Sequence, residues 1–294
     1  MTRQKVLILG VTGMLGHTLF RSLSDSSFYE VFGTARSASG LETFFTNDER
    51  QRIRPFVDAD NFDSVIRALA SVQPDIVINC IGLIKQLAIG SDPLTAITIN
   101  AQLPHRISLI CKAANARLIH ISTDCVFDGK TGMYTETDTP SPIDLYGRTK
   151  LLGETTYPHC LTLRTSIIGH ELKDKLGLVE WFLAQKNTVR GYSGAIYSGF
   201  PTNELAKIIE AFVLPNNDLS GLYHVSSESI SKYDLLHLIK KYYNLTTAIE
   251  PYRDFSCDRS MRSEKFRTCT GYTPPGWDEL ISGMYQDFLE RYTK

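Results

Sequence analysis

Three glycines follow a short apolar run close to the start of the chain. The run Val6–Leu9 has the length of a buried strand, Gly10, Gly13 and Gly16 come directly after it, and leucines then recur every four residues through Leu23. A glycine turn between a strand and a helix lets a pyrophosphate approach the backbone closely and meet the free amides at the helix N-terminus. This order of segments predicts a nucleotide-binding βαβ unit; a plain strand, turn and helix is the alternative.

The spacing of these glycines is GxxGxxG and differs from the GxGxxG of standard dehydrogenases. The predicted phosphate-binding residues are those of the turn and of the first helical turn. They are Gly10, Thr12, Gly13, Met14, Leu15 and Gly16.

The end of the second predicted strand carries no acidic residue. About twenty residues after such glycines, NAD-binding proteins place a carboxylate for the ribose 2′-hydroxyl, but this chain has Arg36 and Ser37 there. A guanidinium and a hydroxyl suit a 2′-phosphate, which favours NADP over NAD; a solvated arginine is the alternative. Asp58, after the third predicted strand, is a candidate for the adenine amino group or for the start of the next helix.

Short apolar runs alternate with longer amphipathic segments over the first half of the chain. This alternation is typical of successive βαβ units, whose strands form a parallel sheet buried on both faces. The predicted strands are Lys5–Leu9, Glu30–Thr34, Arg54–Val57, Ile76–Cys80, Arg117–Ser122, Cys160–Arg164 and Gly221–Val225. The predicted helices are Leu15–Leu23, Phe62–Val72, Pro93–Ala114, Tyr146–Thr155, Val179–Gln185, Glu204–Val213, Lys232–Tyr243 and a last helix after Pro274–Gly276.

We therefore expect an α/β protein with a Rossmann-type doubly wound parallel sheet and a smaller α/β substrate-binding lobe. The NADP-binding domain would comprise residues 1–170, with a return of the chain near 195–225, and the lobe mainly residues 171–294. Between the helices of the lobe, the stretch through Gly191, Gly194, Gly199 and Pro201 is predicted to be rich in turns.

Composition excludes several classes of function. Lysine and arginine total 31 against 32 acidic residues, so no broad positive field favours nucleic acid or an anionic membrane. The six cysteines show no spacing typical of a zinc site or a disulfide framework, and thiols in a reducing cytosol are the better interpretation. No signal peptide and no stretch as long as a membrane span is present, so we expect a soluble cytoplasmic protein without a metal.

A tyrosine and a lysine stand four residues apart at the start of a predicted helix. Asp144 is a candidate helix N-cap, and the spacing puts Tyr146 and Lys150 on one face. A phenol with a pKa near 10 is a poor acid at neutral pH. An ammonium about 6 Å away, at an effective dielectric constant of ~20, stabilises the phenolate by about 3 kcal/mol, or about two pKa units. The pair predicts carbonyl reduction; a surface lysine beside a packed tyrosine is the alternative.

These motifs occur together with others that are typical of one protein family. The chain resembles the extended short-chain dehydrogenases/reductases, and most closely the dTDP-4-dehydrorhamnose reductase group of nucleotide-sugar reductases. The resemblance covers nearly the whole chain. The segments that carry it are Gly10–Gly16, Ile121–Gly129 with Ser122-Thr123-Asp124, Tyr146–Glu154, Leu163–Ser166 and Pro201–Ala206.

The resemblance implies roles for further residues. Thr123 would complete the catalytic set by holding the substrate carbonyl oxygen or the Tyr146 phenol, and Lys150 would also bind the nicotinamide ribose. Asn100 matches a family asparagine that supports the active-site region near the cofactor; packing is its alternative role. The turn that would pass along the cofactor is Asn79-Cys80-Ile81-Gly82, of which Cys80, Ile81 and Gly82 are the predicted cofactor-binding residues.

On the substrate side, the chain departs from the group at two places. The group commonly has a tyrosine where this chain has Cys125, and Lys85 is a second departure, so the sugar is left open. A nucleoside diphosphate needs cations, for which Arg259 ranks before Arg190 and Arg262, although each taken singly fits a solvated arginine. The predicted substrate-binding residues are Lys85, Thr123, Asp124, Cys125, Arg190, Arg259 and Arg262.

The function that the resemblance implies is NADPH-dependent reduction of the 4-keto group of a nucleotide-activated 6-deoxyhexose, for surface polysaccharide precursors. One alternative is an epimerase or dehydratase of the same superfamily, although the acid pair typical of dehydratases is not present after Thr123. Another is a non-catalytic, NADP-binding regulatory subunit like that of methionine adenosyltransferase. A homodimer is left open.

Overall fold

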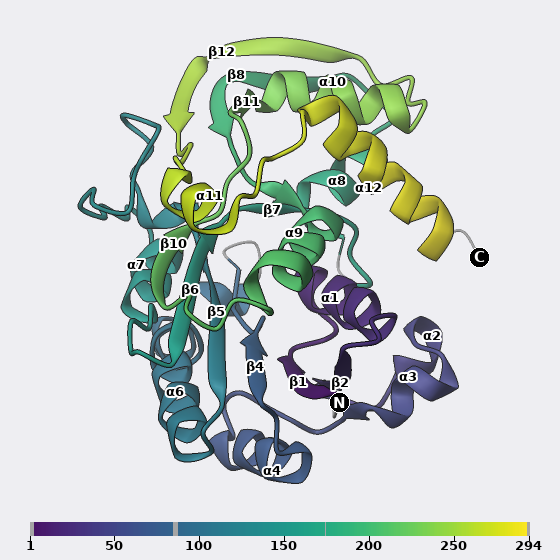
Figure 1. Ribbon diagram of the computed structural model, residues 1–294. Helices are drawn as coiled ribbons and strands as arrows, with labels where there is room; N and C mark the ends of the chain where they lie inside the picture. The colour runs from purple at the N-terminus through teal and green to yellow at the C-terminus, as the bar shows by residue number, and fades with distance from the viewer. Residues whose placement is uncertain (1–2, 85–87, 174, 293–294) are drawn as a thin grey trace. The chain divides into compact units, whose positions relative to one another are not determined.

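The computed structural model describes residues 3–84, 88–173 and 175–292, which form two compact units (Figure 1). The first unit comprises Met1–Ser122, Asp144–Leu163 and Asn216–Leu222. The second comprises Thr123–Ile143, Arg164–Pro215 and Tyr223–Lys294.

A seven-stranded sheet forms the centre of the first unit, in the order β10-β6-β5-β4-β1-β2-β3. The pairs β1/β2, β1/β4, β2/β3 and β4/β5 are parallel. The order 3-2-1-4-5-6 is that of a doubly wound Rossmann fold, so the predicted fold class is confirmed. The strands are β1 (Gln4–Leu9), β2 (Tyr29–Thr34), β3 (Ile53–Arg54), β4 (Ile76–Asn79), β5 (Arg117–Thr123), β6 (Cys160–Thr165) and β10 (Gly221–His224).

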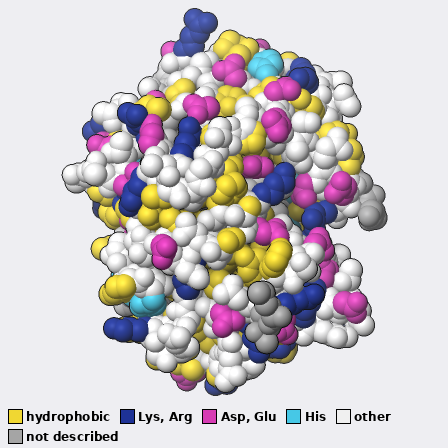
Figure 2. Space-filling view, viewed as in Figure 1, with side chains coloured by type: hydrophobic (Ala, Val, Ile, Leu, Met, Phe, Trp, Pro, Cys, Tyr) yellow, Lys and Arg dark blue, Asp and Glu magenta, His cyan; other side chains and the backbone are white. Residues whose placement is uncertain are grey.

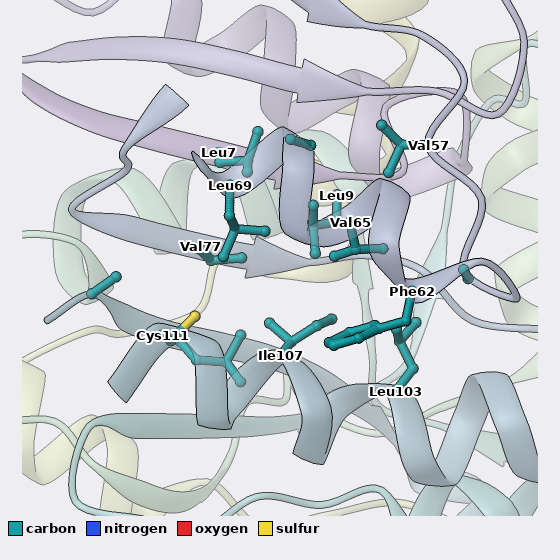
Figure 3. Packing of buried hydrophobic residues seen from close by; sticks show 14 of the residues in the cluster. Leu7, Leu9, Val57, Phe62, Val65, Leu69, Val77, Leu103, Ile107 and Cys111 are labelled. Atoms are coloured by element: carbon teal, nitrogen blue, oxygen red, sulfur yellow. The ribbon is translucent and has the colours of Figure 1, made fainter. Parts of the chain in front are cut away.

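Helices of the first unit cover the sheet because its strands are apolar on both faces. Leu7 and Leu9 of β1 pack with residues of α4 and α6, such as Val65 and Ile107 (Figure 3). The helical segments are α1 (Met14–Ser24), α2 (Leu41–Phe44), α3 (Asn47–Gln51), α4 (Phe62–Val72), α5 (Pro93–Ala96), the π-helical segment Ile97–Gln102, α6 (Leu103–Ala113) and α7 (Leu145–Leu152).

Two predicted helices of this unit differ from the observed ones. The predicted helix Pro93–Ala114 is interrupted by the π-helical segment, and α7 ends at Leu152, three residues before the predicted end. Gly153 follows α7, and a Cβ atom there would lie 2.0 Å from the Asn100 carbonyl oxygen. A glycine that packs this closely is required by contact with another helix, which the local pattern does not reveal.

The second unit contains a three-stranded sheet, β11-β8-β12, and a two-stranded one, β7-β9. Its strands are β7 (Ile167–Ile168), β8 (Val189–Tyr197), β9 (Phe200–Pro201), β11 (Ile230–Ser231) and β12 (Ile249–Asp258). Its helical segments are the 3-10 turn Asp124–Val126, α8 (Leu178–Leu183), α9 (Thr202–Ile208), the π-helical segment Ile209–Val213, α10 (Lys232–Tyr242), α11 (Glu264–Thr270) and α12 (Trp277–Arg291).

The prediction of a turn-rich stretch through Gly191 and Gly194 was wrong, because both residues lie within β8. A Cβ atom on Gly191 would lie 2.6 Å from the Tyr233 ring, and one on Gly194 would lie 2.4 Å from the Phe255 carbonyl oxygen. These glycines therefore allow close packing in the middle of a sheet. In a sequence, a glycine commonly indicates a turn. Here the contacts with Tyr233 and Phe255 explain why each position is glycine.

Residues 123–143 belong to the second unit, whereas the predicted boundary near residue 170 put them in the first domain. The segment is tied to the end of β12 by backbone hydrogen bonds. Asp258 donates to the Gly129 carbonyl oxygen at 2.7 Å, and Tyr134 donates to that of Ser260 at 2.9 Å. The return of the chain to the first unit is limited to Asn216–Leu222.

The described helices include none that is both long and apolar enough to cross a membrane. On the face seen in Figure 2, basic and acidic side chains are interspersed.

A buried histidine and a partly buried glutamate in the second unit predict a pH dependence of stability. Glu180 on α8 binds His170 Nδ1 at 2.7 Å, and His170 Nε2 lies 2.7 Å from the Tyr243 hydroxyl. Burial opposes ionisation of Glu180, but the hydrogen bond and charge of His170 outweigh it and hold the pKa of Glu180 below its usual value.

A carboxyl group whose pKa is lowered by folding stabilises the fold above its unfolded pKa, and that stability is lost as the pH falls through the folded pKa. We expect Glu180→Gln to lower the urea midpoint at pH 7, and the gap to the wild type to narrow below about pH 4.5. A gap that stays constant between pH 7 and pH 3.5 would contradict this interpretation.

Candidate active site

The glycine turn lies between β1 and α1, at the point where the strand order of the sheet reverses. Gly10 has φ +88°, and its amide donates to the Thr34 hydroxyl oxygen at 3.1 Å. Gly13 donates to the Gly10 carbonyl oxygen at 3.1 Å and closes the turn. Strands β1 and β4 are neighbours in the sheet at this switch point, where doubly wound sheets bind nucleotides.

The start of α1 fits the phosphates of a dinucleotide. The N-cap residue is Gly13, which is exposed, and no described side chain caps the helix. The first amides and the positive end of the helix dipole are therefore open to an anion. Thr12 and Met14 are partly buried, whereas the Leu15 side chain is buried, so Leu15 can offer only its amide.

Arg36 and Ser37 follow β2 and are exposed. In the part of the chain that the structure describes, Arg36 makes no ion pair, so its guanidinium is available for a phosphate. Asp58 is also exposed, and its carboxylate accepts from the Asp60 amide at 3.2 Å. Asn61, not Asp58, is the N-cap residue of α4, so Asp58 does not begin that helix.

Lys150 is almost completely buried, at 5% exposure. Its Nζ donates to the Ile121 carbonyl oxygen on β5 at 2.7 Å. A Cβ atom on Gly82 would lie 3.9 Å from this Nζ, so the turn after β4 passes directly beside the ammonium. Burial lowers the pKa of Lys150 to about 8, and the charge of Glu154 is the main effect that opposes this shift.

Helix α7 presents Tyr146 and Lys150 one turn apart. The Asp144 carboxylate accepts from the Gly147 amide at 2.8 Å, so the predicted N-cap is confirmed. Tyr146 is partly buried. The helix thus carries the phenol and the ammonium on one face, beside the carboxyl end of β5.

Asn100 holds the turn after β4 against α7. Its Oδ1 accepts from the Leu83 amide at 2.8 Å, and its Nδ2 donates to the Leu83 carbonyl oxygen at 3.1 Å and to the Thr149 hydroxyl oxygen at 3.3 Å. Both amide hydrogens are therefore used within the protein. These bonds show that Asn100 packs the turn after β4 against α7. Asn100 lies in the π-helical segment Ile97–Gln102, and such segments are frequent at functional sites.

Sequence reasoning missed a buried pair beneath the same turn. Asn79 accepts from the Ile81 amide through Oδ1 at 3.1 Å, and its Nδ2 donates to His120 Nδ1 at 3.2 Å. Burial, helped by the charges of Lys150 and His105, holds the pKa of His120 well below its usual value. Burial also raises the pKa of the Cys80 thiol to about 12. Both groups therefore stay neutral at physiological pH. A histidine within a buried strand is a sequence signal that could have indicated this pair.

In the second unit, Thr123 is buried and its hydroxyl group is fixed by its neighbours. The hydroxyl donates to Asp124 Oδ1 and accepts from the Cys125 amide, each at 3.1 Å. Arg259 donates through Nε to the Phe127 carbonyl oxygen at 2.9 Å and through Nη1 to Cys125 Sγ at 3.4 Å. The structure therefore brings together Cys125 and Arg259, two residues predicted to bind substrate.

Arg190 lies away from this cluster. It pairs with Glu250 in the ladder of β8 and β12, whereas Asp258, next to Arg259, pairs with Ile196. Six residues of strand separate these positions, which is about 20 Å at the usual rise per residue. The same diphosphate cannot contact both arginines directly.

Arg262 is exposed and forms an ion pair with Glu264 at 2.8 Å. Lys85 lies outside the described residues. Of the three predicted arginines, Arg259 is therefore the one that lies beside Cys125.

The geometry of both units agrees with what a family comparison finds. The model of the RmlD substrate binding domain matches residues 4–289. The chain belongs to this family. It is 30% identical to the probable low-salt glycan biosynthesis reductase Agl14 of Haloferax volcanii, over 76% of this chain and 74% of that protein.

A second relative and a solved structure are also similar to the chain. The chain is 27% identical to methionine adenosyltransferase 2 subunit beta of Danio rerio, over 83% of this chain and 76% of that protein. The crystal structure of dTDP-4-dehydrorhamnose reductase from Bacillus anthracis, in complex with NADP, superposes with a TM-score of 0.81 at 22% identity, over 98% of this chain and 99% of that one. The structural likeness confirms the fold.

The glycine turn supports a stability prediction. A Cβ atom on Gly16 would lie 2.1 Å from the Gly10 carbonyl oxygen, so Gly16→Ala must displace backbone and should cost about 1–3 kcal/mol. The matched control is Gly13→Ala, where the same oxygen would be 3.5 Å away, an ordinary contact. Thermal unfolding should show a clear loss of Tm for the first variant alone. Equal Tm values for the two would contradict the close packing.

Proposed function

We propose that this protein is an NADPH-dependent reductase of the 4-keto group of a nucleotide-activated 6-deoxyhexose, of the dTDP-4-dehydrorhamnose reductase type, in surface polysaccharide precursor synthesis. The observation that carries the proposal is Lys150, a buried ammonium bound to the Ile121 carbonyl oxygen one helical turn from Tyr146. The reductase names of two relatives support the class of reaction.

The first unit offers what NADP needs. The uncapped N-terminus of α1 suits the pyrophosphate, and Arg36 and Ser37 suit a 2′-phosphate, since no carboxylate stands beside them. Gly82 lies beside the buried ammonium, and we assign the turn Cys80, Ile81 and Gly82 to the nicotinamide side. When bound, NADPH supplies the hydride that the carbonyl carbon receives.

Tyr146 would supply the proton that the carbonyl oxygen receives. A phenol protonates an oxygen more readily when its anion is stabilised, and the ammonium of Lys150 does this without approaching the substrate. Because the pKa of Lys150 is about 8, the ammonium is largely charged at neutral pH and is lost as the pH rises above that value. Reduction should therefore fall on the alkaline side.

We assign substrate contacts to Thr123, Asp124, Cys125 and Arg259 of the second unit. The Thr123 hydroxyl would orient the carbonyl, and since its hydrogen is donated to Asp124 in this structure, that bond would have to be exchanged for one to the sugar. Arg259 is the candidate for the diphosphate, and the small side chain of Cys125 leaves more room for the sugar than a tyrosine would.

Replacing the phenol tests the chemistry. Tyr146→Phe should keep NADPH binding and lower kcat by about 10²- to 10⁴-fold, because the proton donor is lost while its ring remains. NADPH consumption is followed by absorbance with a panel of dTDP- and UDP-linked 4-keto sugars. Tyr157→Phe, at an exposed position, is the matched control and should retain full activity. An undiminished rate in Tyr146→Phe rules out this acid.

The cofactor preference is tested at Arg36. Arg36→Ala should weaken NADPH binding by about 1–2 kcal/mol while leaving NADH binding nearly unchanged, because only NADPH carries the 2′-phosphate. The control is Arg67→Ala on the exposed face of α4. Fluorescence titration with both nucleotides gives the two Kd values. Equal weakening of NADPH and NADH would contradict the assignment.

A second candidate function is that of a non-catalytic, NADP-binding regulatory subunit, which the relatedness to methionine adenosyltransferase 2 subunit beta favours. The presence of both Tyr146 and Lys150 favours catalysis. Tight NADPH binding without turnover of any sugar in the panel would decide for the regulatory subunit.

A further inference from the structure

Beside the Tyr146/Lys150 pair lies a carboxylate to which the proposed mechanism assigns no part. Glu154 stands four residues after Lys150, just beyond the end of α7. Its Oε1 accepts a hydrogen bond from the Ser122 hydroxyl at 2.7 Å. Ser122 is the residue next to Ile121, whose carbonyl oxygen binds the Lys150 ammonium. One short piece of β5 therefore fixes both the ammonium and the carboxylate.

We propose that Glu154, held by Ser122, is a positioning residue that keeps the Lys150 ammonium charged and seated on the Ile121 carbonyl oxygen. The proposal rests on the proposed function, because Lys150 matters to the reaction through the phenol of Tyr146. It adds to the Tyr146/Lys150 pair a third residue, one to which no contact with cofactor or substrate is assigned.

The need for such a group follows from the burial of Lys150. A charged amine with 5% exposure has lost most of its hydration, which favours the neutral form. The carbonyl oxygen of Ile121 accepts a hydrogen bond but carries no full charge. The charge of Glu154 makes the largest contribution that opposes the effect of burial on the pKa of Lys150.

The other titratable groups that face Lys150 cannot replace this carboxylate. Cys80, in the turn after β4, remains a thiol at neutral pH because burial raises its pKa to about 12. His120, on β5, is neutral and accepts from Asn79. Tyr146, on α7, is the group that Lys150 serves. Among these described groups, Glu154 is therefore the one whose side chain is a carboxyl group.

The path of the chain after α7 explains how the carboxylate reaches this place. Gly153 packs so closely on the Asn100 carbonyl oxygen that the helix ends and the chain turns, and the Glu154 amide donates to the Leu151 carbonyl oxygen at 3.2 Å. The hydroxyl of Ser122 then selects one orientation of the side chain. The carboxylate is held by the sheet and not by the helix that carries the lysine.

The test is the titration of Lys150 itself. In full-length protein with ¹³C-labelled lysine, the Cε resonance of Lys150, assigned by its loss in Lys150→Met, reports the charge of the amine. Glu154→Gln keeps an oxygen for Ser122 but removes the charge, and the midpoint of the titration should fall by about one pH unit or more. The alkaline limb of the kcat profile should move to lower pH by the same amount.

Two further variants separate charge from structure. Glu154→Asp keeps the carboxyl group, so the Lys150 titration midpoint should return most of the way to its wild-type value. This variant remains informative if Glu154→Gln is poorly folded. Glu42→Gln on α2, an exposed glutamate of the same unit, is the control and should change nothing. A Lys150 midpoint that is the same in the wild type, in Glu154→Gln and in Glu154→Asp overturns the proposal.

The titration needs no substrate, so its result is distinguishable from failure of the proposed function. A shifted midpoint supports the coupling of Glu154 to Lys150 even in a protein that reduces no sugar of the panel, whereas absence of turnover contradicts the reductase alone.

Discussion

The hydrogen bond from the Lys150 ammonium to the Ile121 carbonyl oxygen is the interaction on which the proposed site depends. A buried ammonium is costly by several kcal/mol unless it is paired and hydrogen-bonded, so the surrounding structure must keep it in one place. Gly153 contributes to this, because the absence of a side chain there lets α7 pack closely on Asn100. The lysine is therefore a constraint on packing as well as a source of charge.

The strand order explains why a nucleotide turn and a catalytic helix belong to the same unit. Chain order reverses between β1 and β4, and doubly wound sheets bind ligands at the carboxyl ends of the strands at such a point. The glycine turn after β1 occupies one side of it. The turn after β4 lies on the other side and is fixed by two amide side chains. Asn79 is the last residue of β4, and Asn100 lies in the π-helical segment Ile97–Gln102. Neutral amides suit this task because they satisfy backbone groups without adding charge beside Lys150.

Local patterns were sufficient to predict much of this. Apolar runs gave β1, β2, β4, β5 and β6 nearly to the residue, and a capping aspartate, Asp144, marked the start of α7. The contacts between distant segments could not be predicted in the same way. The hydrogen bond between Ser122 and Glu154 joins residues 32 positions apart. Strand β8 could not be predicted from its sequence because it contains Gly191 and Gly194, where residues distant in sequence pack too closely for a side chain. The separation of Arg190 from Arg259 likewise depends on the register of two strands.

The most direct test of hydride transfer to a sugar carbonyl is to follow the hydrogen. NADPH deuterated at the transferring position of nicotinamide C4 is incubated with the enzyme and a nucleotide-linked 4-keto-6-deoxyhexose, and the product is analysed by NMR. A reductase of the proposed kind places deuterium at C4 of the sugar, one atom for each NADPH consumed. Consumption of NADPH without deuterium in the sugar, or a sugar that remains a ketone, would contradict the proposed function.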